Sequence, residues 1–203
     1  MGDKRYISGY CTIQGNSIKL NGKEIFNSGE MPFADFAKQA YRYFETDYPK
    51  FFKMDNLSKL AFLGAELLLK DMREEDKSSI VLLFSNTSSS LDTDVRFEES
   101  IADKENFYPS PAVFVYTLPN ICLGEISIRH RLYTENSFFI FGAFNPQFFA
   151  DYATILLNTN KAQSVLCGWV ELYKEEYKAF LYLVSAEGET EHTIQNIQTL
   201  YLN

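Results

Sequence analysis

The feature that most constrains the fold is an uninterrupted apolar run of strand length at Ser79–Phe84, which reads Ser-Ile-Val-Leu-Leu-Phe. A strand with one solvent-facing side alternates apolar and polar residues, so a continuous run indicates a strand that is covered on both faces. The polar loop Ser85–Asp94 follows at its carboxyl end, where sites gather in open α/β sheets. We therefore expect a layered fold with helices on both faces of a sheet.

Strands and helices alternate along the rest of the chain. Further strands are predicted at Tyr6–Gln14, Ser137–Phe141, Ser164–Glu171 and Tyr177–Ser185. Helices are predicted at Met31–Tyr43, Leu57–Met72, Asp94–Asp103, Ala112–Leu118, Ile121–His130 and Pro146–Asn158. This alternation predicts an α/β fold with five main strands, the first four of them parallel, in a single domain over residues 1–203.

Two turns refine the sheet. The Asn21-Gly22 pair inside Ser17–Phe26 predicts a hairpin between short strands. The last two strands are joined by a short segment with the charged turn Lys174-Glu175-Glu176, which is too short for a parallel crossover. The strand Tyr177–Ser185 is therefore expected to run antiparallel, and we predict it at the edge of the sheet.

Two further local signals concern helix capping and the tail. Asp55 or Asn56 can cap the helix Leu57–Met72, since both side chains accept hydrogen bonds from the first helical turn. The tail after Gly188 ends in Ile-Gln-Thr-Leu-Tyr-Leu. We predict one more edge strand there.

The charge balance argues against nucleic acid as a partner. The chain has 19 Lys and Arg against 27 Asp and Glu, a formal net charge of −8. Binding phosphates needs basic side chains clustered on one face, and here they are scattered along the sequence. An acidic carrier protein would likewise need a local basic patch, which the sequence does not locate.

The cysteines Cys11, Cys122 and Cys167 are far apart and odd in number. Neither metal-ligand spacing nor a disulfide framework fits them, so reduced core thiols are expected, with no metal and no cofactor. Residues 1–30 lack a basic segment followed by an apolar run, and no stretch reaches the roughly 18 apolar residues of a membrane span. We expect a cytoplasmic protein.

Three stretches in order resemble the amino-terminal half of β-ketoacyl-acyl-carrier-protein synthases, which have the thiolase fold. They are Tyr48–Asp71 (YPKFFKMDNLSKLAFLGAELLLKD), Ser110–Asn136 (SPAVFVYTLPNICLGEISIRHRLYTEN) and Ser164–Glu171 (SVLCGWVE). The resemblance covers about residues 1–185. It implies a thiolase-like half fold, a layered mixed five-stranded sheet with one antiparallel edge strand, in the order 3-2-1-4-5 by the family equivalents of the strands.

The sequence departs from this family at the catalytic nucleophile. In the family, a cysteine at a helix amino terminus follows the strand equivalent to Ser137–Phe141, where the helix dipole lowers the thiol pKa. By resemblance that position falls on Ala143, flanked by Gly142 and Phe144, and Asn136–Tyr152 contains no cysteine. Alanine cannot form a thioester, so we predict no catalytic residue here.

The histidines of the family are missing as well. The family condenses thioesters with two histidines of its carboxyl-terminal half, and this sequence ends where that half would begin. Its own histidines, His130 and His192, lie outside the family's histidine motif. The long excursion that lines the family's acyl pocket is replaced by the short turn at Tyr173–Glu176.

Other polar residues carry weaker signals. Ser85 or Ser88 could serve an acyl-thioester hydrolase, although no Ser-His-Asp arrangement supports it. The loop around them lacks the glycines and lysine of a phosphate-binding loop. Glu125 and Glu171 lie in apolar stretches, and Arg129, one helical turn from Glu125, is the predicted structural partner.

The resemblance favours a non-catalytic synthase-like protein, a partner or chain-length-factor-like subunit of a fatty acid, polyketide or aryl-polyene synthase. Alternatives are a scaffold, a protein that binds acyl carrier protein, or the serine hydrolase. The expected assembly is a homodimer, or a heterodimer with a full-length synthase, joined through the strand Ser137–Phe141.

The composition also bears on that assembly. With 18 Phe and 13 Tyr, the chain needs either an aromatic core or an apolar surface that another chain covers. We predict interface rings at Phe138, Phe139, Phe141 and Phe144. The helix Leu57–Met72 or the stretch Ala112–Ile128 is expected to expose an apolar face.

Overall fold

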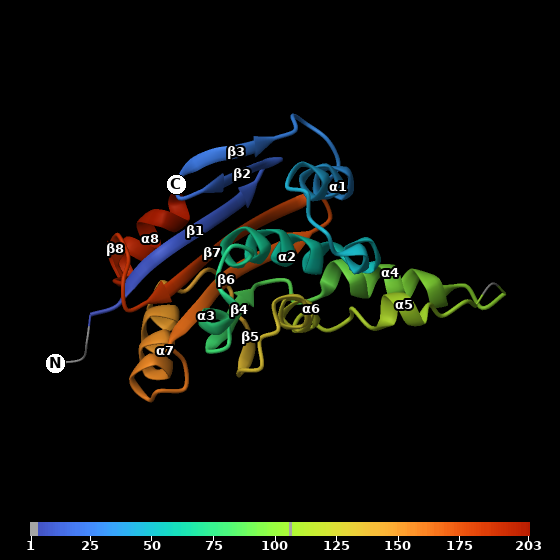
Figure 1. Ribbon diagram of the computed structural model, residues 1–203. Helices are drawn as coiled ribbons and strands as arrows, with labels where there is room; N and C mark the ends of the chain where they lie inside the picture. The colour runs from blue at the N-terminus through green and yellow to red at the C-terminus, as the bar shows by residue number, and fades with distance from the viewer. Residues whose placement is uncertain (1–3, 106) are drawn as a thin grey trace.

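A computed structural model describes residues 4–105 and 107–203 as one mixed sheet with helices on both faces (Figure 1). Its strands are β1 (Tyr6–Gln14), β2 (Ser17–Leu20), β3 (Lys23–Asn27), β4 (Ile80–Asn86), β5 (Asn136–Ile140), β6 (Ser164–Tyr173), β7 (Glu176–Ser185) and β8 (Thr190–Glu191). The helices are α1 (Phe33–Tyr43), η1 (Pro49–Lys53), α2 (Asn56–Leu69), α3 (Glu74–Lys77), α4 (Leu91–Ala102), α5 (Pro111–Phe114), α6 (Ile121–His130), α7 (Pro146–Asn158) and α8 (Ile194–Leu202).

The sheet runs β3-β2-β1-β7-β6-β4-β5, with β8 paired beside β1. The strands β4, β5 and β6 are mutually parallel, while β7 runs antiparallel to both β6 and β1. Consequently β1, β4, β5 and β6 share one direction, as predicted. The mixed α/β class is also confirmed, with more strands than the predicted five.

Two predictions about the sheet are wrong. The strand β7 lies in the centre between β1 and β6, and most of its side chains are buried. Counted along the chain, the five main strands therefore lie in the order 1-5-4-2-3, which replaces the expected 3-2-1-4-5. The two-residue turn determines that β7 pairs with β6. Only the tertiary structure places the distant strand β1 along the other edge of β7.

The tail also differs from its prediction, because it forms the helix α8 rather than an edge strand. The side chain of Thr193 caps it by accepting a hydrogen bond from the backbone N–H of Asn196. Ile194 and Ile197, three residues apart, face the core on the α7 side of the sheet. Packing on that face thus decides the conformation of this segment.

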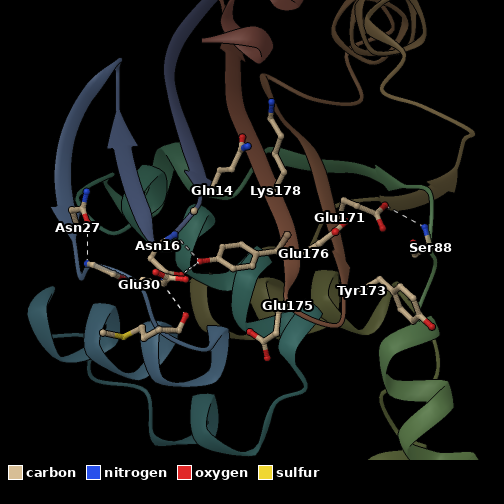
Figure 2. A pocket seen from close by; sticks show the side chains of 14 residues that line it. Gln14, Asn16, Asn27, Glu30, Ser88, Glu171, Tyr173, Glu175, Glu176 and Lys178 are labelled. Atoms are coloured by element: carbon tan, nitrogen blue, oxygen red, sulfur yellow. Dashed lines mark hydrogen bonds between the residues drawn. The ribbon is translucent and has the colours of Figure 1, made fainter.

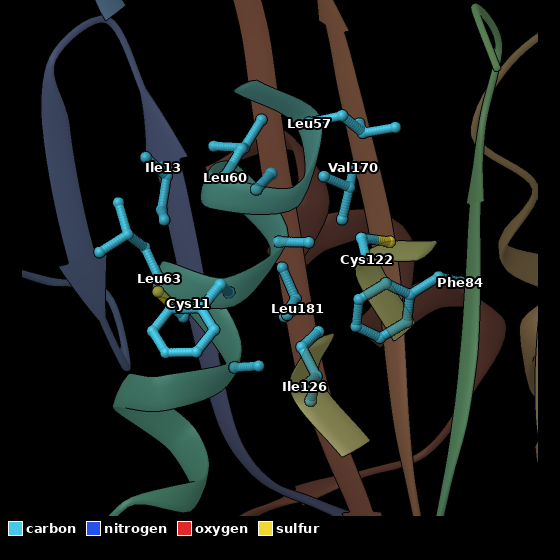
Figure 3. Close-up of a cluster of buried hydrophobic side chains, with 14 of the residues drawn as sticks. Cys11, Ile13, Leu57, Leu60, Leu63, Phe84, Cys122, Ile126, Val170 and Leu181 are labelled. Atoms are coloured by element: carbon cyan, nitrogen blue, oxygen red, sulfur yellow. The ribbon is translucent and has the colours of Figure 1, made fainter. Parts of the chain in front are cut away.

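The helix α2 crosses the centre of the other face (Figure 3). Asp55 caps it, accepting from the Ser58 N–H at 3.0 Å, which confirms the predicted cap. Gly64 allows close approach to the sheet, because an added Cβ would lie 2.9 Å from the Leu181 side chain. The helix is buried on nearly every side, so the expectation that Leu57–Met72 would expose an apolar face is wrong.

The described helices contain none long and apolar enough to cross a membrane.

Candidate functional site

The position that resembles the nucleophile site lies in the turn between β5 and α7. Gly142 and Ala143 are exposed there, and α7 begins three residues later at Pro146. The side chain of Asn145 caps α7 by accepting from the Phe148 N–H at 3.0 Å. The turn therefore has the strand-to-helix geometry that a nucleophile would need. However, the side chain of Ala143 is only a methyl group, and Asn145 already accepts a hydrogen bond from the first turn of α7.

The turn is tied to the neighbouring loop through the backbone. The Phe141 N–H donates to the Asn86 carbonyl at 2.9 Å, and Asn86 also holds the loop after β4 through two side-chain bonds to Ser89. Ser89 has a positive φ of 52°, which this local bonding supports. The loops after β4 and β5 thus meet at the carboxyl end of the sheet, where the sequence placed the polar loop.

The four predicted interface rings divide between the two faces of the sheet. Phe138 packs against the core on the α2 side. Phe139 and Phe141 lie on the α7 side, with ring centres 4.7 Å and 4.8 Å from that of Phe148. Phe144 points inward and stacks on Tyr201 of α8 at 4.1 Å.

A groove of about 890 Å³ lies at the same end of the sheet (Figure 2). It lies between the β1–β2 turn and the β6–β7 turn, and its lining includes Glu30, Glu171, Glu175, Glu176, Tyr173, Tyr177 and Lys178. No histidine or cysteine is among its lining residues. The groove thus offers neither a thiol nor an imidazole for acyl transfer.

Glu171, at the groove, has a structural role in the loop after β4. Its Oε2 accepts hydrogen bonds from the backbone N–H groups of Thr87 at 2.6 Å and Ser88 at 3.2 Å (Figure 2). Lys178 is also engaged, since its Nζ donates to the Tyr201 carbonyl at 2.8 Å and lies 3.9 Å from the ring centre. Both charged groups therefore hold the fold around the groove.

The predicted pair between Glu125 and Arg129 is wrong. Arg129 instead binds Glu66 of α2 through two hydrogen bonds of 3.0 Å and 2.6 Å, and His130 Nε2 lies 3.1 Å from the same carboxylate. Burial alone would raise the pKa of Glu66, but contacts with His130 and Arg129 outweigh it and lower the pKa to about 2. Arg129 pairs with Glu66 because the Glu66 carboxylate is buried and would otherwise be an unpaired charge.

Glu125 has its own partners. It accepts a hydrogen bond from the Tyr116 hydroxyl at 3.0 Å and forms an ion pair with Lys50 at 2.9 Å. Burial, followed by the nearby Glu125 carboxylate, raises the pKa of Tyr116 well above its ordinary range. The interaction is structural and links η1, α6 and the segment after α5.

The cysteines and Ser85 are buried. Cys11, Cys122 and Cys167 are free thiols in the core, and burial raises the pKa of Cys11 and of Cys167 to about 12. Ser85 is fully buried within β4. His192, whose pKa burial lowers to about 4, packs beside Tyr182. Ser88, the other serine candidate, is half-buried and lines the groove, where its backbone N–H donates to Glu171. Within the described residues neither serine hydroxyl bonds to a histidine, so the geometry shows no Ser-His-Asp arrangement.

Comparisons with known proteins give the fold its context. No protein-family model matches the sequence, and no curated protein matches it. A solved structure described as the ishigamide ketosynthase/chain length factor superposes with a TM-score of 0.68 at 16% identity, over 90% of this chain and 62% of that chain. The chain has a ketosynthase-like fold.

Two further solved structures are complexes. A ketosynthase, ApeO, with its chain length factor, ApeC, from Xenorhabdus doucetiae gives a TM-score of 0.61 at 12% identity, over 98% of this chain and 91% of the matched chain. A type II polyketide synthase acyl-carrier protein with its ketosynthase, AntDE:AntF, gives 0.64 at 14% identity, over 90% and 62%. At these identities the likeness concerns the fold.

Proposed function

We propose that this protein is a non-catalytic ketosynthase-like subunit that pairs with a full-length synthase, in the manner of a chain length factor. The observation that carries the proposal is the strand-to-helix turn between β5 and α7, where Ala143 stands at the position that the sequence resemblance assigns to the nucleophile. The fold supplies the strand, the turn and the helix start, but the described residues bring no thiol or imidazole to that turn. A chain that has the ketosynthase fold but lacks the reacting side chain is better suited to pairing with a second chain than to catalysis.

The comparisons add support through chain length. The match to the ApeO and ApeC complex aligns 98% of this chain with 91% of the other, so the matched chain is only slightly longer than this one. That complex joins a ketosynthase to its chain length factor. By contrast, this chain spans only 62% of the ishigamide ketosynthase/chain length factor chain.

The two edges of the sheet also differ in a way that favours pairing at β5. The β3 edge carries Lys23 and Glu24 and a register shift, which are features that block edge-to-edge association. The strand β5 reads Asn-Ser-Phe-Phe-Ile, without charge or proline. Its outer edge is open within the described chain, so a second strand can extend the sheet there.

Exposed apolar side chains concentrate in one segment of the sequence, which includes β5. Ten of the large ones that solvent reaches lie between residues 91 and 140, namely Leu91, Val95, Phe107, Tyr108, Phe114, Val115, Leu118, Ile128, Tyr133 and Ile140. Monomers rarely leave such a surface uncovered. The stretch Ala112–Ile128 thus exposes an apolar face, as one of the two sequence alternatives expected. We infer that α4, α5, α6 and β5 contribute to the contact with a second ketosynthase-fold chain.

Oligomeric state tests the proposal, by sedimentation of the protein alone and with a full-length synthase from the same organism. We expect a specific complex that buries more than roughly 1,000 Å². Ile140→Asp, at a side chain that is 50% exposed on β5, should dissociate it, because the new carboxylate would be desolvated at the contact. Leu202→Asp, 69% exposed on α8, is the matched control and should leave the complex intact.

Activity supplies the second arm of the test. The protein alone should form no acyl-enzyme and should condense no acyl and malonyl thioesters. An acyl adduct on any residue from Phe141 to Asn145 would overturn the non-catalytic role. A monomer under every condition, with and without synthase, would overturn the pairing.

A further inference from the structure

The helix α8 (Figure 1) is attached to the sheet differently at its two ends. At its start, Ile197 is fully buried, and Ile194 packs against the same core cluster. At its end, a hollow of about 290 Å³ lies between the helix and the β1–β2 hairpin, and residues 201–203 line it. The start of the helix therefore rests on close packing, whereas its end is held by individual contacts beside a hollow.

Two lysines hold the end of α8. The Nζ of Lys178, on β7, donates to the Tyr201 carbonyl at 2.8 Å, and the same nitrogen lies 3.9 Å from the centre of the Tyr201 ring. Lys19 of β2 donates to the Asn203 carbonyl at 3.0 Å. Carbonyl groups at a helix carboxyl end lack intrahelical partners and favour a nearby cation. The two lysines therefore fasten this end of the helix to the sheet.

The ring of Tyr201 contacts the turn between β5 and α7. It stacks on Phe144, with ring centres 4.1 Å apart and an angle of 24° between the ring planes. Phe144 also meets the rings of Phe180 at 5.8 Å and Trp169 at 5.9 Å, and both of those residues are buried in the sheet. Phe144 is thus enclosed between the buried rings of the sheet and Tyr201.

The two ends of the turn are fixed by hydrogen bonds. The backbone N–H of Phe141 bonds to the loop after β4, and Asn145 caps α7. Between them, residues 142–143 are exposed, so the inward direction of Phe144 depends on the rings that it packs against. The other described rings around it lie on β6, β7 and α7. Tyr201 differs from these because it belongs to the helix end beside the hollow.

Lys178 also connects this contact with the groove at the β6–β7 turn. The groove of about 890 Å³ and the hollow beside α8 share Lys178, Gln14 and Gly15 among their lining residues. The two spaces are therefore neighbours. Because Tyr201 lines the hollow and stacks on Phe144, the end of α8 stands between the hollow and the turn.

We propose that the end of α8 is a strap that closes over the β5–α7 turn, with Tyr201 as its positioning residue. When the strap is docked, Tyr201 holds Phe144 inward against Trp169 and separates the turn from the hollow. When Lys178 and Lys19 release the helix end, Phe144 loses its cover and the turn opens toward the hollow. This inference does not depend on the pairing proposed above, since it concerns a contact within one chain.

Amide hydrogen exchange of the whole chain, followed by mass spectrometry, tests the strap. At labelling times at which α2 is still protected, we expect Tyr201→Ala to accelerate exchange across residues 141–148 by about three- to tenfold, because an aromatic pair and a cation–π contact are lost. Tyr201→Phe is the matched control and should exchange like the unmodified protein, since it keeps the ring. Lys178→Met keeps an apolar side chain but removes the ammonium group, so it should accelerate the same segment.

The single tryptophan gives a second readout of the same contact. Trp169 is 4% exposed and lies under Phe144, so quenching of its fluorescence by acrylamide should rise by at least about twofold in Tyr201→Ala. In a Phe144→Leu background, Tyr201→Ala should add little further quenching, because Tyr201 acts on Trp169 through Phe144. A merely structural role of Tyr201 would give independent effects of the two substitutions.

Several results would overturn the strap. These are unchanged exchange across residues 141–148 in Tyr201→Ala, equal acceleration in Tyr201→Phe, or acceleration that appears only together with loss of protection in α2. Additive effects of the Tyr201 and Phe144 substitutions on quenching would remove the positioning role of Tyr201. If Tyr201→Ala does not fold, Lys178→Met decides the outcome, since it removes no ring from the core. The oligomeric state is measured separately, so failure here is distinguishable from failure of the pairing proposal.

Discussion

Restoring a thiol at the nucleophile turn separates what the local geometry supplies from what it lacks. Ala143→Cys would place a thiol at an exposed position just before α7. The native thiols give little background, because burial raises the pKa of Cys11 and of Cys167 to about 12 and Cys122 is buried as well. The reactivity measured would therefore belong to the new thiol.

The magnitude follows from the helix terminus. Charge at a helix end is worth about 0.3–1 kcal/mol, which corresponds to about 0.2–0.7 in pKa. Asn145 already caps α7 and Ala143 precedes that cap by two residues, so the lower end of this range applies. Ala102→Cys is the control, since Ala102 is the exposed last residue of α4 and adjoins Asp103. There the helix carboxyl end and the neighbouring carboxylate both raise the thiol pKa, so the two variants should differ by about 0.5–1 in pKa.

The assay is the pH dependence of alkylation by iodoacetamide, followed by intact mass. The thiol of the Ala143→Cys variant should react as a thiolate at lower pH than that of Ala102→Cys, yet transfer no acyl group to malonyl thioesters. A thiol at position 143 that titrates at or above the control would refute the interpretation of this turn as a helix-start site. If the Ala143→Cys variant condensed acyl and malonyl thioesters, the conclusion that the other catalytic groups are missing would be refuted.

Two predictions concern stability. Gly168→Ala should lower the free energy of unfolding by about 1–3 kcal/mol in chemical denaturation, because its Cβ would lie 2.8 Å from the buried Phe84 ring. Gly124→Ala is the control and should be neutral or stabilising, because its Cβ would meet nothing within 4 Å. Equal losses of stability in the two variants would contradict this account. The pKa of His192 is about 4 in the folded protein, below its usual 6.5. As the pH falls, the unfolded chain therefore takes up the proton before the folded one, and the full free energy of unfolding is present only above pH 6.5. Between pH 6.5 and pH 4 about 3 kcal/mol should be lost, and His192→Gln should remove that part of the pH dependence; an unchanged pH profile of unfolding would refute it.

The sequence by itself determined the elements whose signals are local. The apolar run that forms β4, the cap at Asp55 and the two-residue turn before β7 all follow from neighbouring residues. The strand-to-helix turn at Ala143 was likewise predictable, because it depends on a strand pattern followed by Pro146 at a helix start. These features need no knowledge of what packs against them.

Tertiary structure decided what lies beside each element. The centre position of β7 required pairing with β1, some 170 residues away, and the helical tail required the α7 face of the sheet. Arg129 bonds Glu66 across 63 positions instead of Glu125 one turn away, because the buried carboxylate of α2 needs its charge compensated. Local periodicity fixes which residues share a face, but long-range packing alone fixes what that face meets.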